Sequence, residues 1–370
     1  MAPRYSADNE PVKEILRAFH PLRAGFKDSP NRDRPTIDRV ADDSPEATTN
    51  SGKVVVLMPV YDDWAALSKV IDEVDVVLRF SGFRVAVLAV DDGSPTMPHW
   101  NEDRSYVTLT DVSVLRLRRN LGHQRAIAVA LAYVEANLKC DIVVIMDADG
   151  EDDPNDIPRL LEECRRTGGD RIVFAERTRR SESWMFRFFY VLFRIIHRLL
   201  TGHRVRVGNF SVVPRNCLKR LVVVPELWSH YAAAVFVSGQ PFTMIPTARA
   251  SRLDGTSRMN FVSLVAHGLS AISVFSEVVG VRLLLVCAVL ALLALVGVGA
   301  VVTIRTLTAL AIPGWATYSV GLLSIALLQA VMFSIIFCFV ILSGRKSATF
   351  IPSRDSRVFV DEVRRLWTRA

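Results

Sequence analysis

The chain has 370 residues, of which 50% are hydrophobic and 22% charged, and its formal net charge is +7. This composition excludes an intrinsically disordered or acidic solvating protein, because such chains hold too few apolar residues to build a core. Five cysteines show neither CxxC nor metal-ligand spacing, so we expect no disulfide framework and a reducing, cytosolic compartment. The polar first fifty residues predict no signal peptide.

The chain divides into five predicted parts by composition. In order, they are a mobile extension at 1–50 with one short helix near 11–20, an α/β domain at 51–250, an interface helix region at 251–281, two transmembrane helices at 282–344, and a basic cytoplasmic tail at 345–370.

Short apolar runs alternate with helical patterns from Lys53 onward. The runs are VVVLMPV, VAVLAVDD, VSVLRL, DIVVIMD and RIVFA, and the helical stretches are 63–80, 122–138 and 156–167. This alternation predicts an α/β layer with a largely parallel sheet. Ligands of such sheets bind beyond the carboxyl ends of the strands. Three of the predicted strands end in acidic segments there, at 59–62, 91–94 and 147–149.

The segment Asp147-Ala148-Asp149-Gly150-Glu151 follows a buried strand. Carboxylate oxygens at this spacing suit Mg²⁺ or Mn²⁺ bridging a diphosphate, so we predict that Asp147, Asp149 and Glu151 bind a metal ion. The alternative is an ordinary solvated acidic turn. The acids that follow, at 152, 153 and 156, are expected to form a solvated start to the next helix.

Two further segments predict contacts with a nucleotide. In Asp91-Asp92-Gly93-Ser94, one carboxylate would accept hydrogen bonds from a base or ribose while Gly93 lets the ligand approach; the alternative is a plain tight turn. The segment 119–125 opens a helix, where the backbone and Arg125 could hold phosphate. His123 is expected to be a polar helix-start residue rather than a catalyst.

Two uncharged runs near the end, 283–304 and 316–342, are each long enough to cross a hydrocarbon core about 30 Å thick. Arg305 is the only charge between 283 and 343, which favours a transmembrane hairpin over two buried helices of a soluble protein. The tail has seven Lys or Arg against three Asp or Glu, so the positive-inside rule predicts that the domain and both termini are cytoplasmic. Basic residues here indicate anionic lipids rather than nucleic acid.

The motifs PVYDD, VDDGS, RNLGHQRA and DADGEDDP, in this order, resemble glycosyltransferases of family 2 with the GT-A (Rossmann-like) fold. The later blocks AERTRRSESWMFRFFYVLF, GNFSVVPRNCLKRL and SRLDGTSRMN, followed by the hairpin, resemble the polyprenyl-phosphate glycosyltransferases among them, which include dolichol-phosphate mannose synthase and the bactoprenol glucosyltransferases. The resemblance covers about residues 53–343.

The resemblance implies a set of nucleotide contacts, namely Pro59, Tyr61, Asp62 and Asp92. It also implies that Asp147, Asp149 and Glu151 surround the metal and the diphosphate. Two departures from the family pattern matter. The usual Asn-Glu after the Tyr is Asp62-Asp63 here, and the usual Lys after Gly-x-Ser is Arg258, which keeps the charge but changes its geometry.

A lipid monophosphate is already negatively charged near neutral pH and needs cationic hydrogen bonds rather than a general base. Arg177 and Arg187 are our first candidates for this role, followed by Arg252 and Arg258. The segment 181–201 carries arginines on one face and apolar residues on the other, which predicts a helix lying in the membrane interface; a core helix with a solvated arginine face is the alternative. The segment 260–280 has a similar pattern.

The sequence thus predicts a membrane-anchored, inverting glycosyltransferase that uses Mg²⁺ or Mn²⁺. It would move a sugar from a UDP- or GDP-linked donor to a polyprenyl phosphate, at the cytoplasmic face of what we expect to be a bacterial inner membrane. The catalytic candidates are Asp149, Arg177 and Arg187, and the candidates for the nucleotide sugar are Pro59, Tyr61, Asp62, Asp91, Asp92, Arg125 and Asp147.

Two alternatives stay open. A processive polysaccharide synthase usually carries a Gln-x-x-Arg-Trp motif, which this sequence lacks. A non-enzymatic membrane adaptor that binds nucleotide sugars should have lost the metal carboxylates, which are present here. The sequence alone distinguishes neither the sugar nor the nucleobase of the donor. It is compatible with a monomer and with a homo-oligomer.

Overall fold

A computed structural model describes residues 52–97, 100, 104–177, 195–202, 207–248, 268–308, 314–346 and 350–369. Some predictions fall on other residues and therefore lie outside the described part of the chain. These are the helix near 11–20, most of the predicted interface helix at 181–201, and Arg187, Arg252 and Arg258.

The centre of the described structure is an eight-stranded sheet with the order β7-β5-β6-β4-β1-β2-β3-β8. The strands are β1 (Lys53–Val60), β2 (Arg84–Asp91), β3 (Leu109–Leu117), β4 (Ile142–Ile145), β5 (Ile172–Arg177), β6 (Val207–Pro214), β7 (Phe242–Thr247) and β8 (Val360–Thr368). Four neighbouring pairs are parallel, and the three pairs β3-β8, β4-β6 and β5-β6 are antiparallel. The sheet is therefore mixed, and its parallel part is concentrated around β1.

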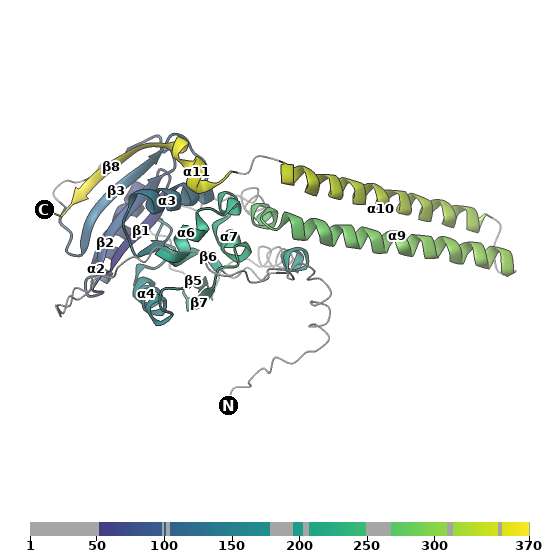
Figure 1. Ribbon diagram of the computed structural model, residues 1–370, viewed down its shortest axis with the longest axis horizontal. Coiled ribbons are helices and arrows are strands. Elements are labelled where there is room, and N and C mark those ends of the chain that lie inside the picture. The colour runs from purple at the N-terminus through teal and green to yellow at the C-terminus, as the bar shows by residue number, and fades with distance from the viewer. Residues whose placement is uncertain are drawn as a thin grey trace, which may run out of the picture. The chain divides into compact units, whose positions relative to one another are not determined.

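Helices cover both faces of this sheet (Figure 1). On one face lie α2 (Trp64–Val77) and α4 (Ile157–Arg166), and on the other lie α3 (His123–Asn137), α6 (Arg215–Leu221) and α7 (Tyr231–Val237). Short helical segments are η1 (Pro154–Asp156), η2 (Pro225–Trp228), α11 (Pro352–Asp355) and η3 (Ser356–Phe359). Because both faces are covered, β1, β2 and β4 are buried almost throughout, which explains their continuous apolar sequences.

The amphipathic pattern of α2 shows how the sequence sets this packing. Leu67, Val70, Ile71 and Val74 are fully buried, and their spacing places them on one side of a helix. Together with Leu160 and Leu161 of α4 they form the core beneath β1 and β2. This core fixes the strands whose ends carry the acidic segments.

Two long apolar helices follow the domain, α9 (Ser276–Leu307) and α10 (Trp315–Lys346), and they pack against each other (Figure 1). Each has 32 residues, which corresponds to about 48 Å and exceeds a hydrocarbon core of about 30 Å. In the most apolar 18-residue stretch of each helix, only 17% is buried in α9 and 6% in α10, whereas a core helix would be mostly buried. Both helices are therefore long and apolar enough to cross a membrane.

The base of α9 contacts the helical residues 195–201 of the domain. Arg282 donates a hydrogen bond from Nη1 to the carbonyl oxygen of Leu199 at 2.8 Å, and the rings of His197 and Phe275 lie edge to face at 6.2 Å. His197 is buried here, whereas the apolar side chains of Ile195 and Leu199 are exposed. In this described turn, Ile195 and Leu199 therefore present apolar side chains to the outside of the domain.

The segment after α10 returns to the sheet. The charge count predicted a basic tail at 345–370, but β8 pairs with β3 as an edge strand (Figure 1). The ring of Trp367 contacts that of Tyr106, with 5.0 Å between their centroids. Arg365 forms an ion pair with Asp111 at 2.9 Å, so its charge is used within the domain. The hairpin is therefore an insertion in the chain of this domain, with the sheet continuing on both sides of it.

Candidate active site

The predicted acidic strand ends lie at one edge of the sheet. The strands β4, β1 and β2 are parallel neighbours, with Val60 opposite Asp91 and Leu57 opposite Ile145. The residues that follow these strands, Asp62, Asp92 and Asp147, therefore come together at the carboxyl edge. The prediction of one acidic edge from three separate segments is confirmed.

The turn after β4 is held by two of its own carboxylates. The backbone N–H of Asp147 donates to Oδ2 of Asp152 at 2.9 Å, and the N–H of Glu151 donates to Oδ1 of Asp149 at 3.0 Å. Asp152 is only 3% exposed, so the prediction that it is a solvated helix-start residue was wrong. The turn folds back on the strand end, and Asp152 fixes the backbone of Asp147.

A chain of polar contacts connects the same turn to α3 and β6. The Nε2 atom of His123 lies 3.2 Å from Oδ1 of Asp147 and 2.9 Å from Nδ2 of Asn209. Gln124 donates to Oδ1 of Asn209 at 3.0 Å and accepts from the N–H of Tyr231 at 2.8 Å. Burial is the largest single effect on His123 and opposes its charged form, but the carboxylates of Asp147, Asp152 and Asp149 together outweigh it and raise the pKa of the imidazole.

The sequence interpretation missed Asn209, Gln124 and Asp152 as site residues. Asn209 was quoted only as part of a longer motif, and nothing local relates β6 to α3, which lies some eighty residues earlier in the chain. His123 was expected to be a simple helix-start residue, and it does begin α3, but it also contacts the Asp147 carboxylate.

The three predicted metal ligands are not gathered into one protein-only site. Among the residues that the structure describes, no group of three or more His, Cys, Asp or Glu side chains could hold a metal ion. Asp147, Asp149 and Glu151 share one short turn after β4. Mg²⁺ commonly binds with one or two carboxylates and the phosphates of a substrate.

The segment 91–93 holds the start of α3. Both carboxylate oxygens of Asp92 accept backbone hydrogen bonds, from Leu121 at 2.7 Å and from Gly122 at 2.9 Å. Burial raises the pKa of Asp92, and these two N–H groups partly offset that effect. A Cβ added at Gly93 would meet the backbone of Arg119 and Asn120.

Replacing Gly93 with alanine is expected to destabilise the domain by about 2–4 kcal/mol. Gly93 has φ of +73°, and an added Cβ would lie 2.6 Å from the carbonyl carbon of Arg119. The matched control is Gly82→Ala, because Gly82 has φ of +72° and nothing within 4 Å of the added Cβ, so only the backbone strain of about 1 kcal/mol applies. Thermal unfolding measures both variants, and equal shifts would contradict the steric argument.

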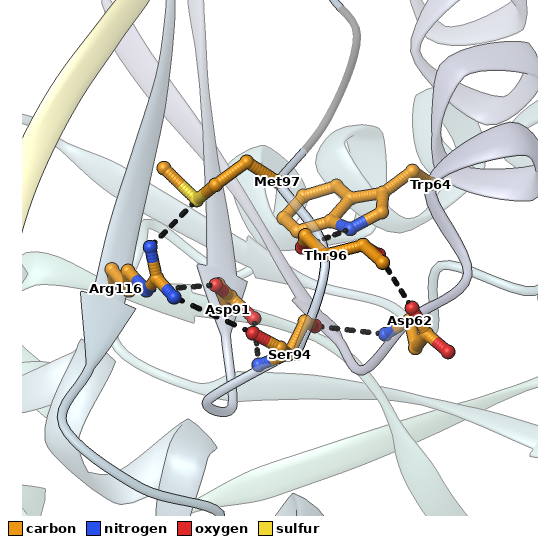
Figure 2. A network of polar contacts seen from close by, with 7 residues as sticks. All are labelled: Asp62, Trp64, Asp91, Ser94, Thr96, Met97 and Arg116. Atoms are coloured by element: carbon orange, nitrogen blue, oxygen red, sulfur yellow. Dashed lines mark hydrogen bonds and ion pairs between the residues drawn. The ribbon is translucent and has the colours of Figure 1, made fainter.

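The loops after β1 and β2 are joined by a polar network (Figure 2). The N–H of Asp62 donates to Oγ of Ser94 at 2.8 Å, and Oγ1 of Thr96 donates to Oδ1 of Asp62 at 2.6 Å. Trp64 donates from Nε1 to the carbonyl oxygen of Thr96 at 3.1 Å. Asp91 is completely buried, and its Oδ1 accepts from the N–H of Ser94 at 2.8 Å.

The remaining predicted residues take different positions. Pro59 is buried within β1, and Tyr61 lies just beyond that strand with 43% of its surface exposed. The guanidinium of Arg125 lies over the ring of Trp228, 5.3 Å from its centroid. Arg177 is the last residue of β5, where it pairs with Thr247 of β7, and so it is not on a strand next to β1 or β4.

Residues 55–221 match the family model of Glycosyl transferase family 2. The match begins in β1 and ends with α6, so it contains the whole acidic edge and the contacts among Asp147, His123 and Asn209. It confirms the prediction of a glycosyltransferase domain. The helices α9 and α10 and the strand β8 lie outside the matched residues.

Solved structures of several sugar-transferring enzymes resemble the chain. Mannosyl-3-phosphoglycerate synthase from Rubrobacter xylanophilus is 16% identical, with 61% of this chain and 73% of that chain covered and a TM-score of 0.42. Glucosyl-3-phosphoglycerate synthase from Mycobacterium tuberculosis, in complex with Mn²⁺, UDP-glucose and phosphoglyceric acid, is 14% identical, with 63% and 81% covered and a TM-score of 0.44. The latter enzyme has also been solved with Mg²⁺ and UDP, at 13% identity, 63% and 81% coverage and a TM-score of 0.41.

The glycosyltransferase domain thus has a GT-A-like mixed α/β sheet, as predicted, and it is followed by the two long apolar helices. The edge of its sheet that carries the acids is formed by β4, β1 and β2, all within the matched residues. This edge is the candidate active site.

Proposed function

We propose that the protein transfers a sugar from a nucleotide diphosphate to a polyprenyl phosphate at a membrane surface. The observation that carries the acceptor class is the hairpin of α9 and α10, whose outward side is apolar and whose two ends both join the glycosyltransferase domain. A lipid acceptor held in the membrane can reach such a domain without leaving the bilayer. The exposed Ile195 and Leu199 beside Arg282 extend this apolar surface onto the domain itself.

The acidic edge supports a metal-assisted reaction. Asp147 and Asp149 present carboxylate oxygens on a turn whose backbone is fixed by hydrogen bonds, and this donor set fits Mg²⁺ or Mn²⁺ shared with a substrate diphosphate. Such a cation, when bound, neutralises negative charge on the departing nucleotide. In this proposal, Tyr61 and Asp62 at the same edge bind the nucleotide.

In the proposed reaction, an oxygen of the lipid phosphate attacks the anomeric carbon of the sugar. The bond between that carbon and the diphosphate oxygen breaks, the electron pair leaves with the nucleoside diphosphate, and the configuration at the carbon is inverted. The attacking oxygen is already anionic near neutral pH, so no proton has to be removed first. Arg177, Arg187, Arg252 and Arg258 remain our candidates for binding the acceptor phosphate.

The positions of the basic residues support one orientation of the protein in the membrane. Arg282 lies at the domain end of α9, and Arg345 and Lys346 end α10, whereas Arg305 is the one charge at the far end. Because basic residues favour the cytoplasmic side, we propose that the domain lies in the cytoplasm and that both helices span the inner membrane of a bacterium.

The test is a transfer assay with the full-length protein in lipid vesicles and Mn²⁺. UDP- and GDP-linked sugars are each offered with polyprenyl phosphate, with polyprenol lacking the phosphate, or with 3-phosphoglycerate. We expect a single sugar on the lipid, and only with polyprenyl phosphate. Three outcomes would contradict the proposal. The first is transfer to 3-phosphoglycerate alone. The second is a growing sugar polymer, which would indicate a polysaccharide synthase, and the third is binding of nucleotide sugar without any transfer, which would indicate an adaptor.

A further inference from the structure

The end of strand β3 carries a residue that no sequence motif singled out. Arg116 is the penultimate residue of β3, directly opposite Asp91 of β2 on one side and Glu362 of β8 on the other. Its side chain is 27% exposed and points toward the loop that follows β2 (Figure 2). A charged residue at this place, in a strand that is otherwise almost entirely buried, has to be stabilised by specific partners.

The guanidinium of Arg116 contacts three separate points of that loop. Its Nε lies 3.7 Å from Oδ2 of Asp91, its Nη1 donates to the sulfur of Met97 at 2.8 Å, and its Nη2 donates to the carbonyl oxygen of Ser94 at 3.4 Å. The three nitrogen atoms of a planar guanidinium can bind in this divergent way, whereas a lysine ammonium offers only one centre. Arg116 therefore connects the beginning, the middle and the end of the segment 91–97.

The contact with Asp91 has a further effect because that carboxylate is completely buried. A buried carboxylate needs charged or hydrogen-bonding partners to stay ionised. Ser94 donates its N–H to Oδ1, and Arg116 supplies a positive charge on the side of Oδ2. Removing the guanidinium would leave the Asp91 charge without this compensation and would favour a rearranged loop.

The loop held by Arg116 in turn holds the loop after β1. Ser94 and Thr96 both bond to Asp62, and Trp64 bonds to Thr96 (Figure 2). Asp62 has φ of +53°, a conformation that residues other than glycine seldom adopt and that surrounding contacts must maintain. The backbone that places Tyr61 and Asp62 at the acidic edge thus depends on the segment 91–97.

We infer that Arg116 is a positioning residue for nucleotide binding: it holds the loop after β2, and through it the loop after β1, in the shape that receives the nucleotide. The inference rests on the proposed function. It also predicts where the effect is weaker. The turn with Asp147 and Asp149 follows β4, on the other side of β1 from β2, so we expect Arg116 to have a smaller effect on the groups near the reacting bond than on the nucleotide.

The test compares three variants of the full-length protein: Arg116→Ala, Arg116→Lys and, as the matched control, Arg118→Ala. Arg118 is two residues further along, is exposed, and donates from Nε to the carbonyl oxygen of Val360 in β8 rather than to the loop. The dissociation constants of UDP and GDP with Mn²⁺ are measured by calorimetry. KM and kcat are measured for the nucleotide sugar that the protein uses.

We expect Arg116→Ala to weaken nucleotide binding and raise KM by about tenfold or more, with kcat changed by less than about threefold. Arg116→Lys should fall between this variant and the wild type because it keeps the charge but not the three contacts, and Arg118→Ala should behave as the wild type. Unchanged nucleotide affinity in Arg116→Ala would overturn the inference. If that variant does not fold, wild-type affinity in Arg116→Lys would overturn it equally.

The wild-type measurements separate this inference from the proposed function. A wild type that binds nucleotide but transfers no sugar to polyprenyl phosphate contradicts the proposed acceptor, while the comparison of nucleotide affinities still tests Arg116. A wild type that binds neither nucleotide overturns both.

Discussion

Replacing Asp149 with alanine is expected to abolish sugar transfer while the domain stays folded. The carboxylate is half-buried, and its Oδ1 accepts a hydrogen bond from the N–H of Glu151 at 3.0 Å. Losing that bond costs only about 1 kcal/mol of stability. Losing a carboxylate that binds the cation should lower the transfer rate by at least about 10³-fold, or about 4 kcal/mol of transition-state stabilisation.

Two variants separate the charge of Asp149 from its role in the turn. Asp149→Asn keeps an oxygen that can accept from Glu151 but removes the charge, so we expect it to be inactive too. Asp153→Ala is the matched control, because Asp153 likewise accepts from the N–H two residues ahead, that of Asn155, at 2.9 Å. This control should keep its activity.

Transfer assays and thermal shifts with nucleotide and Mn²⁺ measure these effects. A ligand that binds only the folded state raises the unfolding temperature, so both Asp149 variants should lose the Mn²⁺-dependent part of the nucleotide shift. Their unfolding temperature without ligand should fall by no more than a few degrees. Normal turnover in Asp149→Ala would contradict the assignment of Asp149 as the main carboxylate of the site.

A chain that ends at residue 275 is expected to misfold, although it contains the whole segment that matches the glycosyltransferase family. It lacks β8, and so it exposes the edge of β3, a strand whose apolar residues are almost completely buried. It also lacks Phe350 and Phe359, whose rings lie 4.0 and 5.2 Å from Trp228. Both rings are half-buried, so losing each of them costs about 1–2 kcal/mol, and a typical domain has only about 5–15 kcal/mol to lose.

The matched variant removes residues 276–349 and joins 275 to 350 through a flexible Gly/Ser linker. It lacks the same apolar helices but keeps α11, η3 and β8, so we expect a soluble, folded domain. Gel filtration, circular dichroism and Mn²⁺-dependent nucleotide binding compare the two chains. Equal unfolding temperatures and equal nucleotide affinities would show that β8 is dispensable.

The sequence predicted well what neighbouring residues determine. Apolar runs ending in acids predicted three strands and their shared edge, because parallel strands with buried faces have a continuous apolar pattern. Two long uncharged runs predicted α9 and α10, although the helices extend beyond them by several residues at most of their ends. The motif around Asp147 and Asp149 predicted the turn that follows β4, and the structure has that turn at the acidic edge.

Contacts between distant segments could not be predicted in this way. The surplus of basic residues near the end predicted a tail rather than a strand. The segment VFVDEVRRLWT nevertheless mixes apolar and charged residues, as an exposed edge strand allows. Its partner β3 lies far away in the chain, and no local pattern reveals that pairing. Asp152 was predicted to face solvent for a similar reason. Its partner is the backbone N–H of Asp147, and the sequence does not reveal that the turn folds back to bring the two together.

The return of the chain to β3 also constrains the order in which the protein can be made. Arg118, next to β3, and Val360, in β8, bond to each other although they are 242 positions apart in the chain. The whole hairpin is synthesised between them. If α9 and α10 span the membrane as proposed, they are inserted before the last strand exists. The strand β8 can then pair with β3 only if the hairpin returns the chain to the side of the membrane on which β3 lies. A complete sheet would therefore indicate that the hairpin has been inserted correctly.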